Sequence, residues 1–252
     1  MSQATATASA RFTDQEWAVR KDLAAAYRLV AHYGWDDLVF THLSARVPGP
    51  EHHFLINPYG YLFDEITASS LVKVDPDGKI VDPGATNHIN PAGFTIHSAV
   101  HMAREEAASV LHLHAPDGVA VSAHADGLLP LSQTAMLCLP YLAYHEYEGV
   151  ALDLDERERL VADLGSRNMM MLRNHGTLTV GTSVGEAFTY MYFLMKGCEI
   201  QVRAMAQGRT WQPSQAALDT TAEQSAFVGP MCELTWPALL RKLDRLGSDY
   251  AT

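Results

Sequence analysis

Two histidines separated by a single residue, His112 and His114, lie in a short apolar run that ends before Pro116. Side chains at positions i and i+2 of a β-strand point the same way, about 6.5–7 Å apart along the backbone, so these imidazoles could share one ion. The alternative is a pair of structural or surface histidines. A third ligand has to come from elsewhere, and His175 precedes Gly176 where another apolar run turns. Three neutral imidazoles with an open position are typical of a catalytic divalent metal site.

The strands expected around these histidines are short and bounded by turn signals. Apolar residues at 110–114 predict a buried strand, and those at 168–172 predict a central strand that ends in a turn. Strand-like pieces at 39–47, 53–56 and 71–74 are separated by Pro, Gly and Asn residues. We therefore expect an antiparallel region in the first half of the chain.

The expected helices begin at caps that can be recognised in the sequence. Thr13 and Ser183 are each followed three residues later by Glu, which is the capping-box pattern. Together with helical periodicity, these signals predict helices at about 14–34, 94–108, 117–125, 184–206 and 236–246. No internal repeat or linker divides the chain, so we expect one domain at 12–210, a flexible N-terminal tail at 1–11, and a C-terminal extension at 211–252 that packs on the same domain.

Composition excludes several classes of function. The chain has 252 residues, 48% hydrophobic and 19% charged, which is ordinary for a globular protein. A formal net charge of −11 disfavours nucleic acid as a partner. No apolar run is long enough for a membrane span and the first residues lack a leader pattern, so we expect a cytoplasmic protein without a membrane partner. The three cysteines, Cys138, Cys198 and Cys232, form no CxxC pair and predict neither disulfides nor a cysteine zinc site.

Five segments carry a resemblance to a known family: THLSAR, FLINPYG, HLHAPDGVAVSA, RNHGTLTVGTSVGEAF and CEIQVRAMA. In their order and spacing, from Arg20 to Gln207, they resemble the class II aldolase/adducin family. The resemblance implies an α/β fold, an α/β/α sandwich with a central, largely antiparallel sheet, and a C4 homotetramer with metal sites near subunit interfaces. It also implies one divalent ion per chain, held by His112, His114 and His175. Zinc ranks first, and manganese, cobalt and iron are alternatives.

The chain departs from the sugar-phosphate aldolases of that family at the positions that do their chemistry. Their Ser-Ser-Glu segment, four residues before a helix histidine, falls on Pro91, Ala92 and Gly93 when counted back from His97. Glycine cannot move a proton, so the usual acid/base is missing. The phosphate-contacting Asn of these enzymes falls on His42. Losing hydroxyl and amide donors at these positions disfavours a phosphorylated substrate.

Two other segments are most similar to the adducin branch of the family. These are NPAGFTIHSAVHMAR, from Asn90, and AYHEY, which ends at Tyr147. Adducin head domains are regarded as non-enzymatic. The chain lacks the basic tail through which adducin acts, so this resemblance does not transfer the cytoskeletal role.

The leading hypothesis is a metal-dependent lyase that cleaves a C–C bond of a small unphosphorylated carbonyl or carboxylate compound, by decarboxylation or retro-aldol cleavage. Decarboxylation suits the missing Glu because it needs no base to begin. The candidate proton donors are His42, His97 and Tyr147, although a helix pair such as His97 and His101 is more often a packed feature than a ligand set, and Tyr147 is more often an interface residue. The candidate substrate-binding residues are Arg46, Asn57, Gly60, Asn90 and Gly93; for Arg46 a carboxylate contact competes with a structural ion pair.

Two further hypotheses remain open. A non-haem Fe(II) oxygenase acting on an aromatic keto acid would use the same three histidines. A non-catalytic, adducin-like binding or scaffold protein would need none of them for activity, and Gly93 favours it.

Overall fold

The computed structural model describes residues 11–82, 88–149 and 155–252; the expected N-terminal tail lies outside these residues except for Arg11. A seven-stranded sheet runs through the molecule in the order β3-β2-β1-β4-β7-β6-β5. Its strands are β1 (His42–Arg46), β2 (Phe54–Ile56), β3 (Val72–Val74), β4 (Ser109–Leu113), β5 (Leu142–His145), β6 (Met169–Leu172) and β7 (Gly176–Gly181). Neighbouring strands pair antiparallel except β5 and β6, which are parallel.

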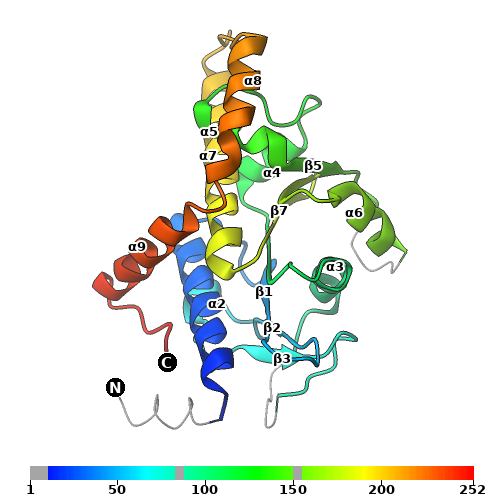
Figure 1. The fold of residues 1–252 in the computed structure, drawn as a ribbon, viewed down its shortest axis with the longest axis vertical. Coiled ribbons are helices and arrows are strands. Elements are labelled where there is room, and N and C mark those ends of the chain that lie inside the picture. Colours follow the sequence, from blue (N-terminus) through cyan, green and yellow to red (C-terminus); the bar gives the residue numbers. More distant parts are fainter. Residues whose placement is uncertain (1–10, 83–87, 150–154) are drawn as a thin grey trace.

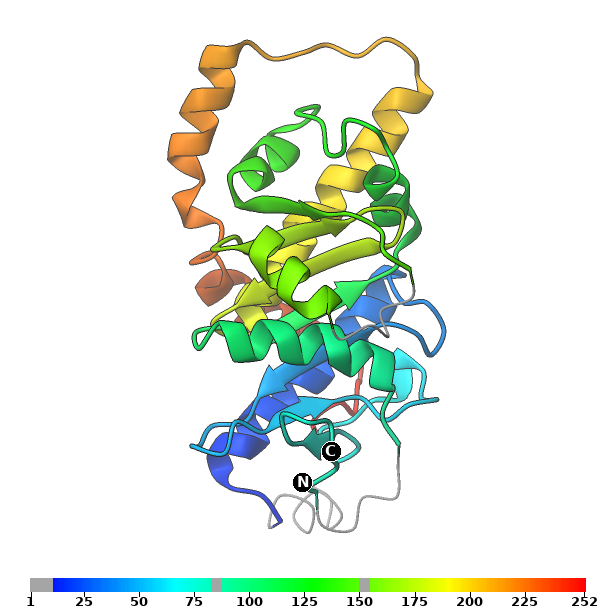
Figure 2. The same cartoon turned by 90° about the vertical axis from the view of Figure 1, so that its right-hand side faces the viewer.

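Helices cover both faces of the sheet (Figures 1 and 2). They are α2 (Asp14–Tyr33), α3 (Pro91–Ala103), α4 (Pro116–Ser122), α5 (Gln133–Cys138), α6 (Glu156–Leu164), α7 (Val184–Ala206), α8 (Gln215–Gln224) and α9 (Cys232–Arg245), with single 3₁₀ turns at Phe63–Glu65, Leu139–Tyr141 and Ser225–Phe227. Helices α3 and α6 lie on one face, and α2, α4, α5, α7 and α9 on the other. The expected α/β/α sandwich with a largely antiparallel sheet is confirmed.

The alternation of side chains along β4 divides the core. Leu111 and Leu113 join the cluster formed with α2, α7 and α9, whereas Val110 lies with α3 and α6 in the opposite cluster. Because successive side chains of a strand point to opposite faces, His112 lies on the same side as Val110. The sheet thus presents His112 on its α3 side.

Both predicted helix starts are confirmed in their caps. Thr13 Oγ1 accepts a hydrogen bond from the Glu16 backbone N–H, and Ser183 Oγ accepts one from that of Glu186, each at 3.1 Å. Gly34, with φ of 68°, ends α2 in the left-handed region. Neither glutamate carboxylate completes the predicted capping box, because that of Glu16 bonds the buried Arg20 guanidinium and that of Glu186 accepts from the Thr182 backbone N–H.

The expectation of a central strand at 168–172 is wrong in one respect. Strand β6 is fully buried, but it lies next to the edge strand β5, and β4 holds the middle of the sheet. Helices on both faces bury β6, so its apolar residues do not indicate whether the strand lies at the centre of the sheet or next to its edge. Strands β5 and β7 and helices α5, α6 and α8 have no counterpart among the sequence predictions.

The C-terminal segment contributes to the core through α9. Trp236 and Leu243 pack in the cluster of α2 and α7, and Trp236 Nε1 donates to Asp22 Oδ1 at 3.1 Å. Helix α8 buries none of its residues and contacts α5, and a long connection separates it from the C-terminal end of α7 (Figure 2). In the part of the chain that the structure describes, no helix has the length and apolar character needed to cross a bilayer.

Candidate metal centre

Three histidines from two separate segments of the chain meet at one end of β4. His112 lies on β4, His114 lies just beyond its end, and His175 lies in the turn between β6 and β7. Asn174 adopts a left-handed conformation (φ 57°) in that turn. A Cβ on Gly176 would lie 2.3 Å from the Leu113 carbonyl oxygen, so only glycine lets the turn approach β4 this closely. Gly176 therefore allows the turn to place His175 beside the other two histidines.

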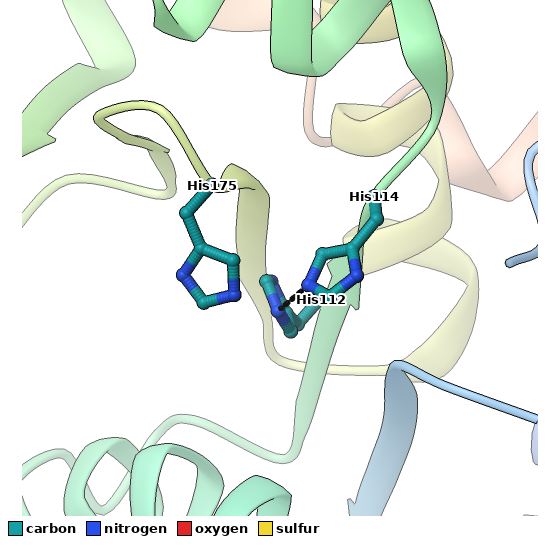
Figure 3. Close-up of side chains that lie close together, drawn as sticks. All are labelled: His112, His114 and His175. Atoms are coloured by element: carbon teal, nitrogen blue, oxygen red, sulfur yellow. Dashed lines mark hydrogen bonds between the residues drawn. The ribbon is translucent and has the colours of Figure 1, made fainter. Parts of the chain in front are cut away.

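The three imidazole rings converge on a common point (Figure 3). Each pair of ring centroids lies 4.8 Å apart, and one ligand nitrogen from each ring lies within 4.8 Å of the others. His112 is buried, while His114 and His175 are half-buried. The cluster thus has a buried side and a side that opens toward solvent, which is where an exchangeable ligand could bind.

The hydrogen bonds of the cluster test whether it suits a cation. His112 Nδ1 donates to the Thr177 carbonyl oxygen at 3.0 Å, and His114 Nδ1 donates to Asp37 Oδ2 at 3.1 Å. A neutral imidazole with its proton on Nδ1 has a bare lone pair on Nε2. The Nε2 atoms of His112 and His114 lie 3.0 Å apart, so two lone pairs face each other unless a proton or a cation separates them. These residues fit a divalent metal ion, with a carbonyl and a carboxylate as the outer partners that metal-ligating histidines ordinarily have.

Burial keeps two of the rings, those of His112 and His175, in the neutral form that binds metals. Burial, together with the neighbouring His114 and His145, lowers the pKa of His175 to about 4. Burial also holds the pKa of His112 well below its usual value, aided by His175 and His114. A cation must displace the proton from each ligand, so a lowered pKa favours metal binding at neutral pH.

His42 and His97 lie beside the cluster on the α3 side of the sheet. His42 pairs directly with His112 across β1 and β4, with 6.2 Å between ring centroids. The His97 ring, on α3, lies 5.4 Å from the His42 ring. Burial lowers the pKa of His42 to about 3, and that of His97 also falls well below its usual value. The structure thus brings both of these sequence candidates to the cluster.

Tyr147 lies beside the cluster, whereas Asn57 is connected to it only through the strand that carries His42. Tyr147 is 54% exposed, and its ring centroid lies 6.4 Å from that of His175. Asn57 is buried just after β2, where Tyr27 Oη links it to the backbone of Leu43, the neighbour of His42. Tyr147 therefore borders the open side, and Asn57 supports the strand that carries His42.

The glycine and asparagine candidates lie in turns and at a helix start. Gly60 is exposed in a turn with φ of 93°. Asn90 precedes α3 and its carbonyl oxygen accepts from the Phe94 backbone N–H at 3.2 Å. Gly93 lies in the first turn of α3, one helical turn before His97. Gly93 and Asn90 therefore begin the helix that brings His97 to the cluster.

Arg46 is not brought to the three histidines. It ends β1 four residues beyond His42, which is about 13 Å along a strand. There its guanidinium contacts the His101 carbonyl oxygen, and His52 Nδ1 at 3.0 Å. It also lies over the Phe54 ring. The strand register thus carries the Arg46 side chain away from the site, and its partners here are a carbonyl oxygen and an imidazole, whereas the structural alternative expected an ion pair.

Sequence reasoning did not identify Asp37 or Ser44. Asp37 lies in the loop before β1, and no local pattern places it against His114. Ser44 lies two residues after His42 on the same face of β1, and its Oγ contacts both His97 Nδ1 at 2.6 Å and His101 Nε2 at 2.7 Å. The i, i+2 spacing of His42 and Ser44 is the signal that could have identified the serine.

Comparison with known proteins identifies the family. The Class II Aldolase and Adducin N-terminal domain matches residues 21–202. The chain belongs to the class II aldolase/adducin family. A Caulobacter vibrioides protein named as a class 2 aldolase is 56% identical over 250 residues, covering 98% of this chain and 97% of that protein. Alpha-adducin of Rattus norvegicus is 42% identical over 245 residues, covering 91% of this chain and 33% of adducin, so the likeness is to one third of adducin.

Solved structures of the family share the whole fold. An aldolase II superfamily protein from Pseudomonas syringae matches with a TM-score of 0.93 and 52% identity, covering 96% of this chain and 98% of that one. L-fuculose 1-phosphate aldolase from Glaciozyma antarctica matches with a TM-score of 0.80 and 27% identity, covering 99% of both chains. The family resemblance found in the sequence motifs is therefore confirmed.

Proposed function

We propose that the chain is a divalent-metal-dependent lyase that cleaves a C–C bond of a small, unphosphorylated carbonyl or carboxylate compound. The observation that carries this proposal is the pair of bare Nε2 atoms of His112 and His114, 3.0 Å apart, with His175 beside them. A divalent ion bound by the three histidines would act as a Lewis acid toward substrate oxygens and stabilise the enolate-like charge left by bond cleavage. Zinc is the first candidate, and manganese, cobalt and iron suit the same ligands.

The residues around the histidines are proposed to bind the substrate and move its proton. His42 and His97 supply neutral imidazoles on the buried side, and Tyr147 supplies a hydroxyl on the exposed side. Gly93 provides no carboxylate one turn before His97, so the site lacks the acid/base expected of a retro-aldol enzyme. Decarboxylation is the reaction this set suits best, since it needs a proton donor only after the bond has broken.

The proposed substrate class differs from the substrate named for one relative. The Glaciozyma antarctica structure is named an L-fuculose 1-phosphate aldolase, yet here Pro91, Ala92 and His42 occupy the positions where the resemblance expects phosphate contacts. Neither proline nor alanine has a side-chain hydrogen-bond donor for a phosphate dianion. We therefore place phosphorylated sugars second to unphosphorylated hydroxy acids and keto acids.

A substrate screen with zinc-loaded protein tests the proposal. Carbon dioxide release or carbonyl formation would be measured with a panel of hydroxy acids and aromatic carboxylates, alongside L-fuculose 1-phosphate. We expect turnover in the first group that is lost in His112→Ala. Turnover of L-fuculose 1-phosphate at ordinary enzymatic rates would overturn the substrate class, and turnover that survives in His112→Ala would overturn the metal-dependent mechanism.

A binding or scaffold role is the second candidate, because the identity to alpha-adducin extends over 91% of this chain. If the protein has this role, His112→Ala should stay folded and change neither activity nor assembly.

The Fe(II) oxygenase alternative uses the same ligands, and oxygen consumption by iron-loaded protein with an aromatic keto acid distinguishes it from the lyase.

A further inference from the structure

A row of buried polar side chains leads away from the metal centre along the contact of β1 with α3. Ser44 on β1 lies between His97 and His101, which are one turn apart on α3. Its Oγ lies 2.6 Å from His97 Nδ1 and 2.7 Å from His101 Nε2. The row ends where His101 Nδ1 lies 2.8 Å from the Ala107 carbonyl oxygen. Ser44, His97 and His101 are each no more than 2% exposed, so these contacts are shielded from water.

The contact of His101 Nδ1 with the Ala107 carbonyl oxygen determines where each proton in the row lies. A carbonyl oxygen only accepts, so His101 carries its proton on Nδ1 and has a bare Nε2. Ser44 must then donate its single proton to His101 Nε2. With that proton used, the Ser44 oxygen accepts from His97, which must carry its proton on Nδ1. His97 Nε2 is left as a bare acceptor.

Burial keeps both imidazoles in the neutral state that this assignment requires. It lowers the pKa of His101 to about 3, and it lowers that of His97 well below the usual value. Among the residues that the structure describes, His97 Nε2 has no hydrogen-bond partner although it is buried. A buried bare nitrogen without a donor is costly, which is expected where a site uses it.

We propose that Ser44 and His101 are positioning residues that fix His97 as the Nδ1–H tautomer and leave its bare Nε2 as a constant hydrogen-bond acceptor beside His42. This proposal deepens the proposed function, on which its role at the metal centre rests, and it makes His97 an acceptor, so that His42 and Tyr147 remain as the candidate proton donors. The carboxylate of the sugar-phosphate aldolases is missing at Gly93. The proposal places a hydrogen-bond acceptor, His97 Nε2, one turn later on helix α3. His112 and His114 follow the same pattern, with Nδ1 donating to a fixed partner and Nε2 bare.

Two-bond ¹H–¹⁵N correlation spectra of histidine ring nitrogens test the tautomer directly in the zinc-loaded, full-length chain, with His97→Gln used to assign the signals. At neutral pH we expect a protonated Nδ1 and a bare Nε2 on His97. Ser44→Ala should convert this to a mixture of tautomers, and Ser44→Thr, which keeps the hydroxyl, should restore the single form. Ser109→Ala is the matched control, since Ser109 Oγ donates to the Ser44 carbonyl oxygen at 2.9 Å without touching either histidine.

A protonated Nε2 on His97 in the unmodified chain would overturn the proposal, as would an unchanged tautomer in folded Ser44→Ala. Metal content measured on the same protein after reconstitution separates this result from the proposed function. A fixed His97 tautomer in a protein that binds none of zinc, manganese, cobalt and iron would contradict the lyase and leave the positioning role intact.

Discussion

At the scale of single residues, the carboxylate of Asp37 sets the tautomer of His114. Its Oδ2 lies 3.1 Å from His114 Nδ1, which leaves Nε2 bare for a metal ion. Asp37→Asn replaces the acceptor by an amide that can turn its NH₂ group toward the ring. We expect metal affinity to fall about 10- to 100-fold, as for other outer partners of ligating histidines.

A competition titration with a chromogenic chelator measures that affinity. Asp36→Asn is the matched control, because it removes the neighbouring charge without removing a contact to His114. Equal losses in the two variants would mean that charge alone matters, and no loss in Asp37→Asn would contradict the assigned tautomer.

The buried histidines His97 and His101 make stability depend on pH. Folding lowers the pKa of His101 to about 3 from an ordinary value of 6.5, so below about pH 6.5 the unfolded state binds the proton that the folded state refuses. Stability is therefore complete above pH 6.5 and is lost as the pH falls toward 3. The free energy of unfolding should drop by about 1.4 kcal/mol per pH unit for each such histidine. Urea unfolding between pH 7.5 and 5 measures this slope; a flat profile would contradict it.

At the scale of elements, the packing of α9 against α7 depends on Gly185. A Cβ at this position would lie 2.7 Å from Trp236 Cγ. Alanine usually stabilises a helix by about 1 kcal/mol relative to glycine, but here we expect Gly185→Ala to destabilise the protein by about 1–3 kcal/mol through overpacking. Thermal unfolding measures the effect.

A double-mutant cycle identifies the cause of that effect. In a Trp236→Ala background the contact with Cγ is removed and only the contact with the residue 236 Cβ, at 2.9 Å, remains, so the loss of stability caused by Gly185→Ala should shrink. The same loss in both backgrounds would mean that α9 does not pack on α7, and would contradict the proposal that residues 211–252 form an extension on the same domain.

The elements also show what sequence reasoning could and could not find. The caps at Thr13 and Ser183 are local hydrogen bonds, so their pattern is complete in the sequence. Strand β7 was missed because Thr177 and Thr179, although buried, resemble a turn or an exposed strand by residue type. Their burial comes from contacts with α7, including the bond from Thr179 Oγ1 to the Ala187 carbonyl oxygen. Such contacts between distant segments leave no local signal.

The same distinction holds for the candidate site. The pattern of His112, His114 and a histidine before glycine could be recognised because strand spacing and family motifs both point to it. The contact of Ser44 with two α3 histidines depends on how a helix packs on a sheet, and no spacing encodes it. Arg46 was a candidate by residue type, and only the strand register places it away from the cluster.

At the scale of the whole molecule, we propose a homotetramer, as the family resemblance implies. Large apolar side chains are exposed beside the metal centre and along the C-terminal segment, including Leu38 at 66%, Trp211 at 90% and Leu234 at 74%. Light scattering after size exclusion should give a mass of about four chains at micromolar concentration. A monomer under these conditions would contradict the tetramer.

Elemental mass spectrometry of anaerobically purified protein determines whether the three histidines hold one divalent metal ion. We expect close to one zinc, manganese, cobalt or iron per chain in the unmodified protein and in His32→Ala, whose side chain is exposed on α2. His112→Ala should lose the metal while keeping its fold. No metal in the unmodified protein after reconstitution, or equal metal in His112→Ala, would contradict a metal site at these histidines.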